Sequence, residues 1–172
     1  MSTLKVNAVT NLAAETPYQP TLMTAVASTS GTSIDFTGIP SWAKRVTVIL
    51  NEVSTNGTSA LLIQIGNGSV ITSGYVSTSN SFNQSSSTSG ASSTAGFVVN
   101  SNDATFVRSG IVTLHLVDTS NTWISSHMVK LNTSQVAVGG GSKGLSGVLD
   151  RVRVTSVTPD TFDAGSINVM YE

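Results

Sequence analysis

Apolar and polar residues alternate with the period of a β-strand along most of the chain from about residue 24 onward. A period of two places every second side chain on one face, which is typical of a half-buried sheet. Clusters of Gly, Pro, Asn and Asp separate the alternating segments and indicate turns. The expected strands are 32–37, 45–53, 60–65, 110–117, 123–131, 135–138, 148–157 and 162–171.

The connections between these segments suggest how the strands follow one another. Asn56-Gly57 is a strong hairpin signal between 45–53 and 60–65, and Asp118–Asn121 forms the turn of a hairpin over 110–131. The glycine run at 139–144 lacks the order of a phosphate-binding loop, so we expect a hinge that ends a short strand. Short strands spaced by turns predict an all-β fold, an antiparallel β-sandwich or jelly-roll-like domain over residues 24–172.

The first 23 residues differ from the rest. Pro17 and Pro20 stiffen an extended link, and the preceding residues show only a short alternation. We therefore expect residues 1–23 to form an extended N-terminal arm that docks on a neighbour, with Leu4, Val6 and Tyr18 as candidate attachment residues.

A second unusual segment, 77–96, is rich in Ser and Thr and contains one large apolar residue, Phe82. This composition predicts a long, polar, exposed loop or an irregular sheet edge. Such a loop is either a flexible excursion or a surface that contacts a ligand or partner. The candidate contact residues are Phe82, Asn83 and Gln84, with Tyr75 just before the segment.

Composition excludes several classes of protein. The 172 residues include 28 Ser and 23 Thr, and only 10% are charged, with a net charge of −1. No basic surface for nucleic acid is expected from this balance. No apolar run is long enough to span a membrane, and the first residues lack the pattern of a secretory signal. The chain contains no cysteine, which excludes disulfide bonds and thiolate chemistry.

Few residues offer reactive groups. His115 and His127 lie on the two arms of the expected 110–131 hairpin near Asp118, but no third ligand has metal spacing. Asp160 and Asp163 supply too few oxygen ligands to bind calcium. We expect no metal, no cofactor and no enzymatic activity. Trp42 either stacks on a sugar ring at the surface or packs in the core or in a subunit interface.

Several stretches resemble tailed-bacteriophage virion proteins. Met1-Ser-Thr-Leu-Lys-Val-Asn-Ala-Val-Thr10 is similar to the start of phage fibre proteins. Three further stretches, 32–50 with its Ile-Pro-Ser-Trp42, 145–155 and 161–171, resemble a module at the C-terminal ends of tail fibres. The resemblance covers most of residues 24–172 and implies an architecture and a virion setting, with no catalytic residues to carry over. Fibres normally place a long stalk before this module. About 23 residues precede it here, so we expect any reach to come from another protein.

The resemblance implies a structural protein of the virion, assembled in the host bacterial cytoplasm. We expect a tail fibre, tip or baseplate-associated component that adheres to a host surface glycan. The alternatives are a head decoration or collar protein, and a carbohydrate-binding module. The expected partners are two further copies, in a homotrimer, and other virion proteins; no nucleic acid and no membrane insertion are expected.

Overall fold

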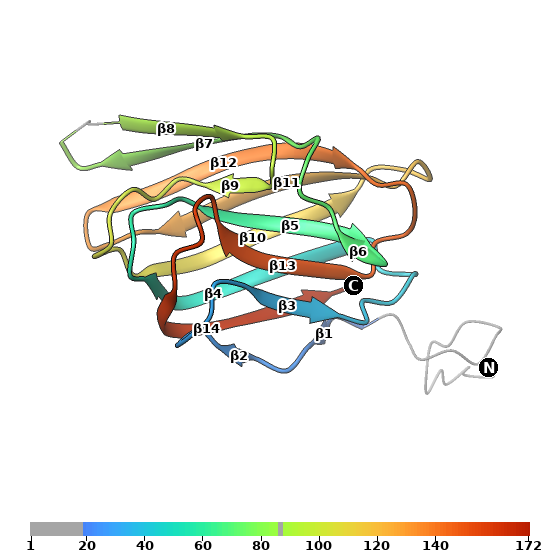
Figure 1. Cartoon of the computed structure of the whole chain (residues 1–172). Coiled ribbons are helices and arrows are strands. Elements are labelled where there is room, and N and C mark those ends of the chain that lie inside the picture. The colour runs from blue at the N-terminus through green and yellow to red at the C-terminus, as the bar shows by residue number, and fades with distance from the viewer. Residues whose placement is uncertain (1–18, 86–87) are drawn as a thin grey trace, which may run out of the picture.

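A computed structural model describes residues 19–85 and 88–172 and folds them into two antiparallel β-sheets packed face to face (Figure 1). The β-sandwich expected from the alternation is therefore confirmed. In chain order the strands are β1 (Thr21–Leu22), β2 (Val26–Ala27), β3 (Ile34–Thr37), β4 (Arg45–Thr55), β5 (Leu61–Asn67), β6 (Ser69–Val70), β7 (Val76–Asn83), β8 (Thr88–Ser93), β9 (Phe97–Val99), β10 (Arg108–Leu116), β11 (Thr122–Lys130), β12 (Gln135–Gly144), β13 (Arg151–Ser156) and β14 (Phe162–Tyr171).

The larger sheet has nine strands among the described residues, in the order β1-β14-β4-β10-β11-β12-β7-β8, with β2 also on β14. The smaller sheet has the order β3-β13-β5-β6, with β9 also on β5. The expected arm is described only from residue 19, and Thr21–Leu22 within it forms β1, paired with Met170 and Tyr171. Leu4, Val6 and Tyr18 lie outside the described residues.

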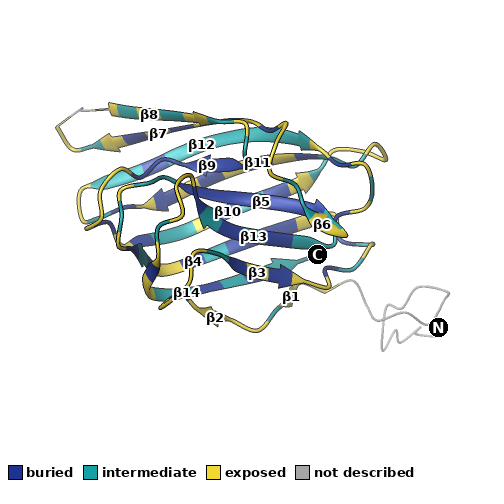
Figure 2. Cartoon of the chain, viewed as in Figure 1, coloured by how far each residue is buried: buried dark blue, intermediate teal, exposed yellow. Residues whose placement is uncertain are grey.

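The core lies between the two sheets. Buried residues alternate with more exposed ones along much of β4, β10, β11, β13 and β14, and Figure 2 shows the buried residues of the sandwich in dark blue. Aliphatic and aromatic residues fill this layer, among them Val48, Val112, Trp123, Val154 and Ile167. Removing this much apolar surface from water is the main stabilising contribution to the fold.

The hairpin over 110–131 is confirmed, because β10 and β11 pair from Ser109↔Lys130 to Leu116↔Trp123. The hairpin expected at Asn56-Gly57 is wrong: β4 belongs to the larger sheet and β5 to the smaller one. This turn crosses between the layers, and the carboxylate of Asp160 fills the space beside Gly57. The connection from β13 to β14 also crosses between the sheets.

The glycine run does not end a strand. β12 continues through Gly139, Gly140 and Gly141, paired with β11 on one side and β7 on the other. A Cβ at Gly139 would stand 2.4 Å from Thr78 O, and one at Gly141 would stand 2.4 Å from Val76 O. The missing side chains therefore allow β7 to approach β12, so the glycines serve pairing and not a hinge.

The Ser- and Thr-rich segment is an ordered edge of the larger sheet over most of its length. β7 and β8 form a hairpin with Phe82 paired to Thr88 and Ser77 paired to Ser93. Ser77, Ser79 and Ser81 point inward and are buried. Their hydroxyls accept hydrogen bonds from Val98 N, Asn100 N and Asn100 Nδ2 at 2.8–3.3 Å. Serine hydroxyls thus join the larger sheet to β9 of the smaller one.

Candidate functional site

The strand register gives the sandwich two distinct ends. At one end, which we call the base, Thr21 pairs with Tyr171, and Glu172 bonds to the backbone of Arg45. The opposite end, which we call the tip, carries the turn between β7 and β8, beyond Phe82 and its partner Val136. Figure 1 shows the first described residues and the C-terminus together at the end opposite this turn.

At the tip, the β7–β8 hairpin presents a contact surface that carries no charged side chain of its own. Phe82 is 41% exposed on the outer face of β7, and Gln84 is exposed in the turn that follows. Asn83 is half-buried, and its Oδ1 accepts a hydrogen bond from Ser85 N at 3.0 Å. These three candidate residues therefore lie together. An exposed ring beside amides and hydroxyls suits an uncharged polar ligand such as a sugar.

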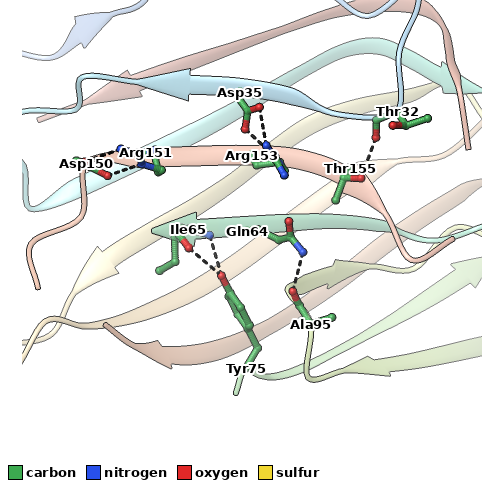
Figure 3. Close-up of polar contacts among 10 residues, drawn as sticks. All are labelled: Thr32, Asp35, Gln64, Ile65, Tyr75, Ala95, Asp150, Arg151, Arg153 and Thr155. Atoms are coloured by element: carbon green, nitrogen blue, oxygen red, sulfur yellow. Dashed lines mark hydrogen bonds and ion pairs between the residues drawn. The ribbon is translucent and has the colours of Figure 1, made fainter. Parts of the chain in front are cut away.

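Tyr75 corrects one expectation. Its side chain is 1% exposed, so it does not contact a host or partner. Its hydroxyl accepts a hydrogen bond from Ile65 N at 2.8 Å and lies 2.9 Å from the Ile71 carbonyl (Figure 3 shows the contact with Ile65). Burial raises the pKa of Tyr75 to about 12. Tyr75 packs edge-on against Phe97 of β9, with ring centroids 5.0 Å apart, so its ring and its hydroxyl both contact the smaller sheet.

Trp42 lies at the base, away from Phe82. It is half-buried, packs against the core and meets Tyr171 edge-on with ring centroids 5.5 Å apart. The candidate contact residues therefore divide between two ends of the molecule, and Trp42 does not belong to the tip surface.

The two histidines do not share a site. His127 pairs with Val112 and points into the sandwich, whereas His115 pairs with Ile124 and is exposed on the outer face. His127 Nε2 lies 2.9 Å from Ser79 Oγ. Burial lowers the pKa of His127 to about 4, so the imidazole is neutral at physiological pH.

Asp160, Asp163 and Asp35 each bond to another part of the chain. Asp160 Oδ2 accepts a hydrogen bond from Ser59 N at 2.8 Å, and Asp163 bonds to Ser54 Oγ. Asp35 and Arg153 form a bidentate ion pair across β3 and β13, at 2.7 and 2.8 Å (Figure 3). These contacts stabilise turns and strand pairs.

Asp118 likewise caps its own turn. Hydrogen bonds from the Ser120 hydroxyl and backbone N–H hold the pKa of Asp118 below its usual range. It also borders a cleft at the base.

A cleft of about 450 Å³ opens at the base and was not expected from the sequence. Its residues come from three connections that are far apart in the chain, and no local pattern signals their meeting. Apolar side chains including Val117, Trp123 and Val148 lie beside polar groups of Lys44 and Asp118. An apolar lining with a few polar groups is typical of small-ligand sites. The full lining is Ser41, Ala43, Lys44, Leu116, Val117, Asp118, Thr119, Asn121, Trp123, Val148 and Leu149.

Within the described residues no three His, Cys, Asp or Glu side chains stand close enough to hold a metal ion, and no helix there is long and apolar enough to cross a membrane. Comparisons of the chain with protein-family models, with curated proteins and with solved structures found no match.

Proposed function

We propose that this chain is a non-enzymatic structural protein of a tailed-phage virion, a tail fibre, tip or baseplate-associated component that adheres to the host. The observation that carries the proposal is the separation of the two ends. The chain enters the sandwich at the base, where β1 pairs with β14, and the β7–β8 turn lies at the opposite end. A protein anchored through its N-terminal arm would therefore direct the tip away from the particle.

The chemistry of the tip agrees with a role in adhesion. No Asp, Glu, Lys, Arg or His occurs between Glu52 and Asp103, so β5 to β9 carry no side chain that is charged at neutral pH. Binding through hydroxyls, amides and one aromatic ring is little affected by salt, because screening acts on charges. This suits contact with neutral sugars outside a cell.

The expected homotrimer has a suitable surface on the outer face of the larger sheet. Ile49, Ile111, Met128 and Val138 stand in one cross-strand row over β4, β10, β11 and β12. Ile111 is 48% exposed and Met128 is 65% exposed. Burying this row between three copies would add apolar contact area without bringing charges together.

The base cleft favours a second candidate function, a carbohydrate-binding module. Its lining combines Lys44, Asp118 and Asn121 with aliphatic side chains. In that case the ligand would bind at the base, and changes at the tip would have no effect on it.

The head decoration or collar alternative predicts a different environment for the tip. It requires the β7–β8 hairpin to pack against neighbouring virion proteins, so the hairpin would be covered in the particle. Adhesion requires the same surface to be free.

Binding of the purified chain to host cells tests the adhesion proposal. The double variant Phe82→Ser, Gln84→Ala removes the ring and amide of the tip and should lose most of the binding. Thr119→Ala, at the base cleft, serves as the matched control and should bind like the native chain. Equal binding by the tip variant would contradict adhesion through the tip, and loss only in the control would favour the base cleft.

A further inference from the structure

We propose that two copies of this chain join edge to edge through β8, antiparallel across a two-fold axis, so that their larger sheets become one continuous sheet. β8 is the last strand of the larger sheet and pairs only with β7 among the described strands. An edge strand presents unpaired N–H and C=O groups and is a template for another strand.

The side chains and bonds of the hairpin show which backbone groups face outward. Ser89 O accepts a hydrogen bond from Asn100 Nδ2 at 2.6 Å, and Ala91 O accepts one from Thr78 Oγ1 at 3.4 Å. The carbonyls of Ser89 and Ala91 therefore point toward β7. Since successive residues of a strand direct their backbone groups to opposite sides, those of Thr88, Gly90 and Ser92 point to the open edge.

Natural sheets protect their edges with charged residues, proline, bulges or very short strands. β8 has six residues, none of them charged or proline, and its pairing with β7 is continuous. The other edge strands of the described chain differ. β1, β2 and β6 have two residues each, β9 has three, and β3 carries Asp35 in its ion pair with Arg153. β8 is thus the longest uncharged edge.

Three properties favour a second copy as the partner. The strand reads Thr-Ser-Gly-Ala-Ser-Ser, so its small side chains let another backbone approach closely. A two-fold axis would place like against like, which costs nothing here because no charge lies between Glu52 and Asp103. Antiparallel pairing of outward residues sets Gly90 opposite either Gly90 or Ser92 of the other copy, and both registers overlap most of the strand.

The absence of cysteine from the chain makes cross-linking a direct test. If Gly90 faces Gly90, their Cα atoms would lie about 5.5 Å apart; in the other register Ala91 would face Ala91 at about 4.5 Å. Both distances allow a disulfide. Gly90→Cys meets only the side-chain end of Asn80 within 3 Å, which is exposed and free to move. We expect one of the two variants, Gly90→Cys or Ala91→Cys, to give covalent dimers on mild oxidation.

Thr58→Cys, in the exposed turn after β4, is the control and should stay monomeric on denaturing gels. A second arm uses Ser92→Lys, which puts a charge on the edge, and Thr58→Lys as its matched control. Light scattering should show that Ser92→Lys loses the paired species while Thr58→Lys keeps it, with circular dichroism confirming folding. Pairing through β8 is refuted if neither cysteine variant cross-links more than Thr58→Cys. It is equally refuted if Ser92→Lys keeps the native mass, or if the native chain never pairs at high concentration.

Discussion

At the scale of single residues, the buried polar groups matter more than the exposed ones. Ser79 Oγ accepts a hydrogen bond from Asn100 N and lies beside His127 Nε2. Tyr75 satisfies the backbone of β5 from within the core. Leaving a buried partner without its hydrogen bond costs about 1–3 kcal/mol, so these residues are tightly constrained although their types are common on surfaces.

His127 predicts a pH dependence of stability. Its pKa is about 4 in the folded state and near 6.5 in an unfolded chain, so the unfolded state binds the proton first. The contribution of neutral, buried His127 to the free energy of unfolding is fully present above pH 6.5 and is lost as the pH falls toward 4. Between pH 7 and pH 4.5 the loss should be about 2–3 kcal/mol.

Urea unfolding at the two pH values measures this loss. In His127→Gln the free energy of unfolding should fall clearly less between the two pH values, because the buried titrating group is gone. His115→Gln, on the exposed face, should keep the native pH dependence. A similar loss in native chain and His127→Gln would disprove the assignment to His127.

Tyr75→Phe tests the buried hydroxyl. The ring and its contact with Phe97 remain, but Ile65 N–H loses its acceptor, so unfolding free energy should fall by about 1–3 kcal/mol. Tyr171→Phe is the control for loss of a tyrosine hydroxyl at a half-buried position and should change little. An unchanged midpoint for Tyr75→Phe in urea would contradict the hydrogen bond.

At the scale of strands, the glycines of β12 determine how closely the edge hairpin packs. Gly139→Ala would place a Cβ 2.4 Å from Thr78 O, a backbone atom that cannot move alone. We expect the free energy of unfolding to fall by about 1–3 kcal/mol, as when a core is overpacked. Gly144→Ala on the same strand meets nothing closer than 3.9 Å and should be tolerated. Thermal unfolding of the two variants gives the comparison, and equal midpoints would show that β7 does not depend on the glycines.

The apolar row on the outer face of the larger sheet, which includes Met128, is the proposed interface of the trimer. Met128→Lys puts a charge into the apolar row and should abolish the three-copy species in analytical ultracentrifugation. Val157→Lys changes another exposed apolar residue, 58% exposed after β13, and should keep it. The proposed trimer should also melt at a lower temperature on dilution. A native mass in Met128→Lys would mean that this row is not the interface.

Most strands could be predicted because their two faces differ in polarity. Arg45–Thr55 and Phe162–Tyr171 alternate apolar and polar residues, and that pattern alone indicates a half-buried strand. β7 could not be predicted in this way, because its inward residues are serines. The period of two is present in Ser77, Ser79 and Ser81, but their hydroxyls serve buried backbone groups instead of an apolar core.

Connections and sites were harder to predict than strands. Asn56-Gly57 has the local character of a hairpin, yet the partner of β5 is β13, about 90 residues later, through nonlocal pairing. The base cleft has the same origin, since Lys44, Asp118 and Val148 meet only in the folded chain. The exposure of Phe82 could be expected from the sequence, because a lone aromatic residue among serines has no apolar neighbours along the chain with which to form a core.

At the scale of the whole molecule, the two ends of the sandwich differ in the residues that they present. The base holds β1, the C-terminus and Trp42, and the tip holds Phe82 and Gln84. Strands that run the length of the molecule connect the two ends, so the sandwich would hold the proposed attachment end apart from the proposed contact surface.

Deleting residues 1–20 tests the attachment end. The deletion stops before β1 at Thr21, so the sandwich should fold and unfold with its native midpoint. Incorporation into particles should be lost, because the proposed attachment residues are gone. Quantitative blotting of purified particles measures this, and normal incorporation of the shortened chain would contradict anchoring through the arm.

The most direct test of the central proposal is the position of this chain in intact virus particles, determined by cryo-electron microscopy of purified virions. The account predicts density for the sandwich on the tail, with Thr21 and Tyr171 toward the particle and Phe82 directed outward. Absence of the chain from purified particles would contradict a virion role, and a reversed orientation, with the β7–β8 turn against the particle, would contradict adhesion through the tip.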